Sequence, residues 1–328
     1  MRYLLVASAA LLSPTLLTAQ EHPSDTLLTV NRYLDFESVS QPKVSPDGSQ
    51  VFWTRSSVDK MKDQFETGLW LMNADGSKQR FLVKGSNAVW SPDGTRIAYL
   101  AEAEPGGNQI WVRYMDAEGA ITQVTREQKA SANIKWSPDG KSIGFSMFVP
   151  SVPSWKIDLP SAPPGANWTK APRLVEALHY RADRQGFLDA GYTHLFVVPA
   201  IGGTPRQITK GEWNVGARGT GLPGSVGWDW APDGQSVAFH RDVAGTLQVF
   251  VLDVRTRTVR QLTSVGRNED PTWAPDSRHL AFVSDRSGYR QLWIIDLDTG
   301  RIRPLLQQSG ARLPAWSPRL PEATSSTP

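Results

Sequence analysis

The sequence predicts an all-β fold made of repeated four-stranded antiparallel units, and three observations support this. A turn motif with the pattern Trp-Ser-Pro-Asp-Gly recurs at steps of 46, 46, 94, 43 and 43 residues. Each copy is followed by short apolar runs with the two-residue period of half-buried strands. Glycine and proline, 27 and 24 residues, mark the turns between these runs. A period of about 40 to 50 residues with four strands per unit is typical of the blades of a β-propeller.

Residues 1–20 have the pattern of a secretory signal peptide. Arg2 gives a positive start, and the run from Leu4 to Leu17 is almost entirely apolar. That run is shorter than the roughly 20 residues that a membrane-spanning helix needs. We expect cleavage near Ala19 or Gln20, with an uncleaved N-terminal anchor as the alternative. The mature protein is therefore expected in a periplasm or outside the cell.

Backbone chemistry accounts for the turn motif. Proline presets φ for the second residue of a β-turn, and the glycine that ends the motif accepts a positive φ. The preceding tryptophan ends the innermost strand of its unit. We expect it to pack between neighbouring blades rather than to stack on sugars or bases. The copies are Val44-Ser-Pro-Asp-Gly48, Trp90-Ser-Pro-Asp-Gly94, Trp136-Ser-Pro-Asp-Gly140, Trp230-Ala-Pro-Asp-Gly234 and Trp273-Ala-Pro-Asp-Ser277, followed by the shorter Trp316-Ser-Pro-Arg319.

Three further strands complete each predicted unit, in a constant order. The second strand alternates apolar and polar residues over 51–54, 97–100, 143–146, 237–240 and 280–283. The third strand is a second apolar run over 69–72, 110–112, 195–198, 249–252 and 292–295. A turn rich in Asp and Gly then leads to a short last strand, such as Arg206–Thr209 or Arg260–Thr263.

The step of 94 residues indicates an insertion at about residues 149–190. This segment is rich in proline, and a loop longer than about 12–15 residues in a compact domain is usually functional or disordered. Only the stretch Arg173–Tyr180 is predicted to add a strand or helix.

We predict a single propeller domain over residues 21–320, followed by a disordered tail at 321–328. Five units are complete, and Leu313–Trp316 would supply the innermost strand of a sixth. Leu27–Tyr33 could add an outer strand to that blade, so that the two termini close the ring together. We therefore expect six blades, with a ring of five as the alternative.

These motifs resemble two families of propeller proteins. The repeated turn, the Arg260–Thr263 ending and the closing Pro314–Leu320 resemble TolB-like PD40 (WD40-like) repeat proteins. Val39–Gly48, Tyr180–Phe187 and His194–Val198 resemble the propeller of acylaminoacyl-peptidase-type serine peptidases of the prolyl oligopeptidase family. The first resemblance implies an exported, non-catalytic scaffold that binds through its loop face and central channel. The second implies a propeller that gates substrates for an α/β-hydrolase domain absent from this chain.

We expect no catalytic, cofactor or metal site in this chain. The peptidases need a Gly-x-Ser-x-Gly elbow, and the nearest string, Gly224–Gly227, follows Pro223 where the first glycine should stand. The sequence contains no cysteine, which excludes disulfides and thiolate metal sites. The five histidines are scattered and are expected in structural or surface roles. Two aspartate pairs, Asp229 with Asp233 and Asp285 with Asp296, fit turn capping better than calcium binding.

Binding of a protein or peptide is therefore the predicted function. Lys and Arg (35) barely exceed Asp and Glu (32), so we expect mixed-sign faces, no nucleic-acid partner and no integral contact with a membrane. Arginine and aromatic residues in and after the insertion have the composition of interaction hot spots on loops held by a scaffold. Alternatively, they fold the loop back on its blade. We expect a monomer whose candidate partner-binding residues are Arg181, Arg184, Tyr192, Trp213, Arg218 and Trp228.

Overall fold

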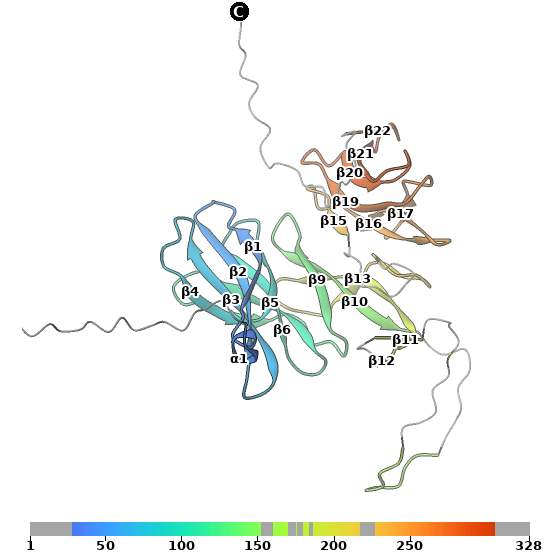
Figure 1. Cartoon of the computed structure of the whole chain (residues 1–328). Helices are drawn as coiled ribbons and strands as arrows, with labels where there is room; N and C mark the ends of the chain where they lie inside the picture. Colours follow the sequence, from blue (N-terminus) through green and yellow to red (C-terminus); the bar gives the residue numbers. More distant parts are fainter. Residues whose placement is uncertain are drawn as a thin grey trace, which may run out of the picture. The chain divides into compact units, whose positions relative to one another are not determined.

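The computed structural model describes residues 28–151, 160–169, 175, 180–183, 186–216 and 227–305. Within these ranges the chain is almost entirely β-structure, with one helical turn, α1 (Val30–Tyr33) (Figure 1). It divides into two compact units. The smaller contains the described part of Met1–Ser38 together with Ser56–Glu66, and the larger contains Val39–Arg55 and the described residues from Thr67 onward.

Five four-stranded antiparallel sheets, which we number blades 1 to 5, account for most strands in the described part of the chain. This arrangement confirms the predicted all-β propeller class. Blades 1 and 2 contain β1 (Ser38–Val44), β2 (Gln50–Asp59), β3 (Gln64–Asn73), β4 (Arg80–Lys84), β5 (Ser86–Trp90), β6 (Arg96–Glu102), β7 (Asn108–Tyr114) and β8 (Ile121–Gln123). Blade 3 contains β9 (Ser131–Trp136), β10 (Ser142–Pro150), β13 (Gly191–Pro199) and β14 (Arg206–Gln207). Blades 4 and 5 contain β15 (Trp228–Trp230), β16 (Ser236–Val243), β17 (Thr246–Asp253), β18 (Val259–Gln261), β19 (Asn268–Trp273), β20 (His279–Ser284), β21 (Gln291–Asp296) and β22 (Ile302–Pro304).

The insertion separates the two central strands of blade 3. β10 and β13 pair from Ser142 with Pro199 to Pro150 with Gly191, so the insertion leaves and re-enters at adjacent positions. Between them lies a small hairpin of β11 (Arg181–Ala182) and β12 (Gly186–Phe187). Most of the stretch 173–180, where a strand or helix was expected, lies outside the described residues.

The predicted contribution of the N-terminal segment to a sixth blade needs one correction. Val30–Tyr33 form the helical turn α1 rather than a strand, with the Tyr33 N–H donating to the Thr29 carbonyl at 2.9 Å. The other expected strand, Leu313–Trp316, lies outside the described residues. The number of blades therefore stays a prediction.

A backbone irregularity recurs three residues before the end of the innermost strands. Gln41, Asn87, Asn133 and Asp270 have φ values of 54°, 51°, 52° and 54°. The pairing register shifts at this point in β5, β9 and β19. Asn and Asp adopt this left-handed conformation more readily than most residues, and one such residue in a strand makes a β-bulge. The repeat thus includes a bulge that the turn motif alone does not predict.

A buried hydrogen-bond unit explains the threonine that closes the recurring Arg-Gln-Leu-Thr ending of the blades. In blade 4, Thr263 Oγ1 accepts from the Val249 N–H at 2.9 Å and donates to Gln248 Oε1 at 2.8 Å. Gln248 Nε2 donates to the Gly266 carbonyl at 2.9 Å. Gln109 and Thr125 form the same bonds to Ile110 and Glu127 in blade 2. We call this arrangement the Gln–Thr clip.

Thr263→Val is expected to lower the free energy of unfolding by about 1.5 kcal/mol. The substitution keeps the side-chain shape but leaves the buried Val249 N–H without its acceptor, and an unsatisfied buried donor costs about 1–3 kcal/mol. Urea denaturation of the two proteins measures the change. Thr263→Ser, which keeps the hydroxyl, serves as the control and should lose less. Equal stability of Thr263→Val and the wild type would contradict the importance of the clip.

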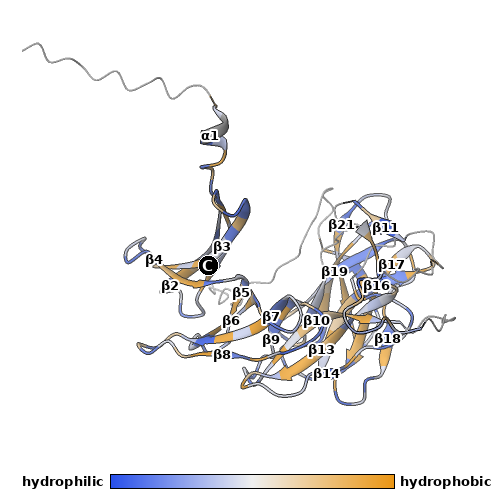
Figure 2. Ribbon diagram, turned by 90° about the horizontal axis from the view of Figure 1, so that it is seen from below, coloured by the Kyte–Doolittle hydropathy of each residue, from blue (hydrophilic) through white to orange (hydrophobic). Residues whose placement is uncertain are grey.

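Four clusters of buried apolar residues join neighbouring blades of the larger unit. Figure 2 colours the apolar residues of these strands orange. Trp136, Trp230 and Trp273, which precede turns, are only 7%, 8% and 5% exposed. The indole N–H of Trp136 donates to the Val89 carbonyl in blade 2 at 3.1 Å, and that of Trp90 donates to the Lys43 carbonyl in blade 1 at 3.2 Å. These tryptophans therefore join neighbouring blades, as expected.

Candidate partner-binding site

The site is built at the end of blade 4 that lies away from its Trp-Ala-Pro-Asp-Gly turn. There Arg241 lies near the end of β16, and the segment after blade 3 passes close by. Val215 forms an antiparallel bridge with Arg241, and the Gly216 N–H donates to the His240 carbonyl at 2.7 Å. Asn214 Oδ1 accepts from the Thr193 N–H of β13 at 2.7 Å. These bonds hold the segment against both blades.

The guanidinium group of Arg241 lies between two aromatic rings. Its Cζ is 4.5 Å from the ring centroid of Trp213 and 4.5 Å from that of Phe250. Trp213 stacks on buried Phe239, with centroids 5.6 Å apart and ring planes at 4°. We call Arg241, Trp213, Phe239 and Phe250 the Arg241 site. Stacking on rigid rings fixes the guanidinium plane at little entropic cost.

Arg241 is not neutralised by its surroundings. Burial lowers the pKa of its guanidinium group. Its buried Nε–H has no acceptor, and no carboxylate among the described residues forms an ion pair with it. Arg241 as a whole is only partly buried, and a partly desolvated cation is suited to an oxygen acceptor that a partner brings to the accessible part of the guanidinium group.

Two buried histidines flank this site. In blade 3, His194 replaces the glutamine of the Gln–Thr clip. Its Nδ1 lies 3.2 Å from Thr209 Oγ1 and its Nε2 lies 3.1 Å from the Gly211 carbonyl. His240 Nδ1 accepts from the Asp270 N–H at 3.0 Å, so the proton resides on Nε2, 3.3 Å from the Gly216 carbonyl. Burial lowers the pKa of both imidazoles, and a carbonyl partner or nearby acid offsets this only partly. Both rings are neutral at pH 7.

His194→Gln should weaken the acid sensitivity of the fold. A histidine whose folded pKa lies below its unfolded value of 6.5 stabilises fully above pH 6.5. That stability is lost as the pH falls toward the folded pKa, at up to about 1.4 kcal/mol per pH unit. Glutamine can make the same two hydrogen bonds, as Gln109 and Gln248 do. Unfolding free energies measured between pH 5 and 8 should fall less steeply below pH 6.5 in the variant; an identical slope would refute this origin.

A second cluster of arginines lies in blade 5. Glu269, only 4% exposed on its side chain, is paired with Arg267 at 3.3 Å and with Arg290. Arg286 lies between Phe282 and Trp293, with its Cζ 5.2 Å and 5.0 Å from their ring centroids. The Nη2 of Arg286 donates to Asn268 Oδ1 at 2.8 Å. Unlike Arg241, these groups have partners that hold the blade together.

The six predicted partner-binding residues do not form one surface cluster in the described part of the chain. Trp213 belongs to the Arg241 site, and Tyr192 is half-buried on β13. Arg181 is exposed on the insertion hairpin, 5.9 Å from the Phe187 ring. Trp228 is a correction: it is 2% exposed in the core between blades 3 and 4, so it has no surface for a partner. Arg184 and Arg218 lie outside the described residues.

The sequence analysis did not predict Arg241 as a binding residue or His194 as a member of the Gln–Thr clip. Arg241 follows a predicted strand directly, and its stacking on Trp213 depends on a connection whose path the sequence does not give. His194 had a readable signal, since it stands where blades 2, 4 and 5 carry glutamine near the start of the third strand. The repeat alignment could therefore have predicted its role in the clip.

The aspartate pairs that were weighed as metal ligands make hydrogen bonds instead. Asp233 caps its turn through the Gln235 N–H, and Asp296 accepts from the Thr299 N–H. Asp229 and Asp285 accept backbone N–H groups of Trp273 and Arg267. In the part of the chain that the structure describes, no group of three or more His, Cys, Asp or Glu could hold a metal ion.

The fold and its repeat define the chain as a β-propeller. The TolB beta propeller domain (PD40) matches residues 220–322. Among curated proteins, the "Uncharacterized peptidase YuxL" of Bacillus subtilis is 24% identical over 67% of this chain and 32% of its own length. The "Dipeptidyl-peptidase 5" of Porphyromonas endodontalis is 28% identical over 39% of this chain and 19% of its own length. The chain thus spans about a third or less of these relatives.

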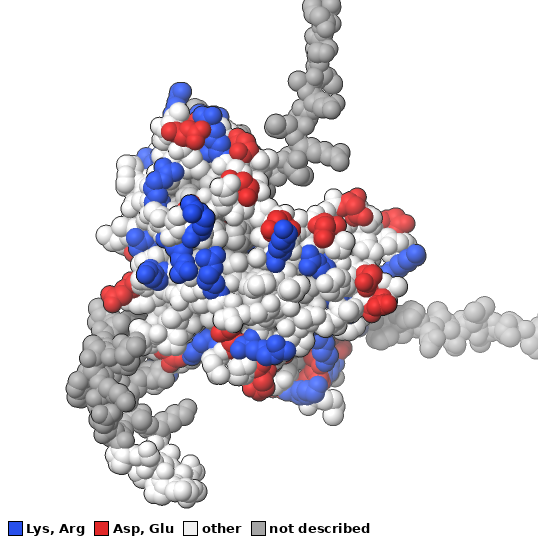
Figure 3. All heavy atoms as spheres, turned by 180° about the vertical axis from the view of Figure 1, so that it is seen from behind, with Lys and Arg blue, Asp and Glu red and all other residues white. Residues whose placement is uncertain are grey.

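A solved structure agrees on the fold. Acylaminoacyl peptidase of Pyrococcus horikoshii superposes with a TM-score of 0.59 at 16% identity, covering 84% of this chain and 40% of that one. The expected resemblance to TolB-like and peptidase propellers is thereby confirmed. On the face drawn in Figure 3, basic and acidic side chains are interspersed, with several Lys and Arg gathered in one part. No helix in the described ranges has the length and apolarity to cross a bilayer.

Proposed function

We propose that this chain is an exported, non-catalytic β-propeller that binds a protein or peptide partner at the Arg241 end of its blades. The observation that carries this proposal is the partly exposed guanidinium group held between Trp213 and Phe250 without an ion-pair partner among the described residues. Arginine and tryptophan fixed over a packed core have the character of binding hot spots. The acceptor they suit is a carboxylate or backbone carbonyl of the partner.

Selection of peptides from a random display library on the purified chain tests the proposal. Enriched peptides are then titrated by calorimetry into the wild type and into Arg241→Gln. We expect the variant to bind at least about tenfold more weakly, because a charge-assisted bond at a hot spot is lost. Arg255→Gln, an exposed arginine beyond the opposite end of β17, is the matched control and should bind as the wild type does. Equal affinity of Arg241→Gln would overturn the proposed site.

Export is a further part of this proposal, and it depends on removal of the predicted signal peptide. The mature N-terminus should then lie near residue 20 or 21. N-terminal sequencing of the protein recovered from the periplasm or medium of a bacterial host measures this. Recovery of an intact Met1 from the cytoplasm alone would contradict export.

A second candidate function is the gating of substrates for a serine peptidase domain. Two relatives that are named peptidases favour this candidate. The chain aligns with only 32% and 19% of their lengths, so these peptidases contain further segments beyond the aligned part. An in-frame hydrolase elbow in the downstream coding sequence would support gating and argue against the scaffold. An assay of the purified chain with acetylalanine p-nitroanilide should give no hydrolysis under either proposal. Turnover that survives repurification would refute the non-catalytic assignment.

A further inference from the structure

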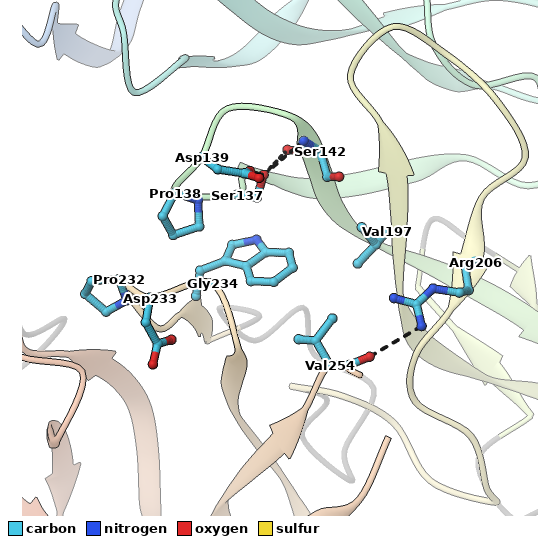
Figure 4. Close-up of a pocket in the computed structure, with 11 residues that line it drawn as sticks. Ser137, Pro138, Asp139, Ser142, Val197, Arg206, Pro232, Asp233, Gly234 and Val254 are labelled. Carbon is cyan, nitrogen blue, oxygen red and sulfur yellow. Dashed lines mark hydrogen bonds between the residues drawn. The ribbon is translucent and has the colours of Figure 1, made fainter. Parts of the chain in front are cut away.

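A cavity of about 430 Å³ lies between blades 3 and 4, at the turn end and thus away from the Arg241 site (Figure 4). The blade 3 turn contributes Ser137, Pro138, Asp139 and Ser142, and the blade 4 turn contributes Trp230, Pro232, Asp233 and Gly234. Val197, Arg206 and Val254 complete the lining. Two neighbouring copies of the repeated turn therefore border a space whose other side is lined by Val197 of β13, Arg206 of β14 and Val254, which follows β17.

The equivalent space between blades 2 and 3 is filled by an arginine of the chain itself. Arg96, two residues after its turn, places its Cζ 4.8 Å from the ring centroid of Trp136. Its Nη2 donates to the Gly140 carbonyl at 2.9 Å and lies 3.9 Å from Asp93 Oδ2. Its side chain is only 15% exposed. The repeat thus shows how a guanidinium group is bound at this position.

The groups that hold Arg96 recur in the cavity, but the arginine does not. By position in the repeat, Trp230 corresponds to Trp136, Gly234 to Gly140 and Asp139 to Asp93. Ser142 stands in the place of Arg96, and its short side chain leaves the volume open.

The glycines beside these two spaces, one between blades 2 and 3 and one between blades 3 and 4, show the same difference. A Cβ on Gly140 would lie 3.5 Å from Arg96 Nη2, whereas a Cβ on Gly234 would meet only Pro138 Cδ, at 3.9 Å. The space beside Gly234 is therefore open where the space beside Gly140 is occupied.

The charges of the lining favour a cation on one side of the cavity. Hydrogen bonds, first from the Ser137 hydroxyl and then from the Lys141 N–H, lower the pKa of Asp139. Asp139 and Asp233 lie toward the two turns, and Arg206 lies at the far side with its Nη1 on the Val254 carbonyl at 3.3 Å (Figure 4). Two carboxylates thus belong to the lining, while the one lining cation donates to another acceptor.

We propose that this cavity binds an arginine side chain of a peptide or protein partner. The guanidinium group would stack on Trp230, donate to the Gly234 carbonyl and approach Asp139, as Arg96 does with its own three partners. Asp233, which lies in the same lining, adds a second carboxylate. The proposal concerns a different end of the blades from the Arg241 site and does not depend on the function proposed there.

An NMR titration of the ¹⁵N-labelled full chain tests it. The probe is the tripeptide Gly-Arg-Gly, acetylated and amidated at its ends, and the readout is the indole N–H resonance of Trp230, assigned with Trp230→Phe. We expect a saturable shift with this probe and none with the matched citrulline peptide, which keeps the shape but lacks the charge. Free arginine, as a separate arm, should bind more weakly if backbone contacts of a peptide contribute. Absence of a saturable shift, or an equal shift with citrulline, would overturn the proposal.

Three variants provide internal controls. Ser142→Arg should reproduce the Arg96 arrangement in the cavity and reduce binding of the probe at least about tenfold by occupying the site. Arg96→Ser should open the neighbouring junction, so that the Trp136 indole also responds to the probe. Asp233→Asn, which keeps the acceptor for the Gln235 N–H, should weaken binding about threefold without disturbing the turn. If Ser142→Arg folds and still binds the probe as the wild type does, the site is refuted. If Ser142→Arg does not fold, undiminished binding by Asp233→Asn refutes the site instead.

Discussion

Replacing Phe239 with alanine is expected to lower the free energy of unfolding by about 4 kcal/mol. Phe239 is 0% exposed and stacks on Trp213 and Phe250, with ring centroids 5.6 Å and 5.7 Å away. Truncation of a buried phenylalanine costs about 3–5 kcal/mol, because apolar burial is lost and a cavity remains. Chemical denaturation followed by circular dichroism measures the change.

The same substitution should also loosen the Arg241 site, since Phe239 supports the ring on which Arg241 lies. Phe239→Leu is the matched control. It retains most of the apolar volume and should cost about 1 kcal/mol. If alanine and leucine destabilised the fold equally, the loss would come from the stacked rings and not from the apolar volume that leucine retains. Phage-selected peptides should bind the leucine variant better than the alanine variant.

Asp229→Ala is expected to destabilise the protein by about 2 kcal/mol. One carboxylate oxygen of Asp229 accepts from Lys135 Nζ of blade 3 at 2.9 Å, and the other accepts from the Trp273 N–H of blade 5 at 3.1 Å. A single side chain in blade 4 therefore bonds to both neighbouring blades. Most of the loss comes from the Trp273 N–H, because a half-exposed ion pair contributes only about 0–1 kcal/mol.

Asp229→Asn separates these two contributions. Asparagine can still accept from the Trp273 N–H but carries no charge for Lys135, so the loss should be about 0.5 kcal/mol. Added salt should reduce the difference between the wild type and the asparagine variant, and thermal unfolding at low and high salt measures it. A loss as large for asparagine as for alanine would assign the main effect to the ion pair instead.

The repeat made most of the fold predictable. Each unit has a tryptophan before its turn, then an alternating apolar run and then a continuous one. This pattern specifies the order of the strands and their buried face, because both depend on local chemistry and on a two-residue period. Trp136 and Trp273 accordingly pack where the pattern places them. Trp228 does not follow the surface role proposed for it, because it pairs with Phe239 in the sheet and faces the core. Composition marks a residue as suited to a hot spot but does not state which side of a strand it occupies.

The candidate sites were less predictable, because they depend on contacts across long separations in sequence. Arg241 stacks on a tryptophan 28 positions earlier that reaches it through an irregular connection. The cavity beside Trp230 depends on the absence of a large side chain at Ser142, which is visible only when blades are compared position by position. The helical turn α1 was mispredicted because a short apolar segment satisfies either a strand or a helix pattern.

The tryptophans between the blades also give the molecule a set of built-in optical probes. Trp90, Trp136, Trp230 and Trp273 each mark one junction, and the last three are at most 8% exposed. Repeat proteins contact mainly their nearest neighbours and can open one unit at a time. Variants that keep only one of these indoles would therefore report, through the red shift of its fluorescence, the order in which individual junctions become hydrated during unfolding.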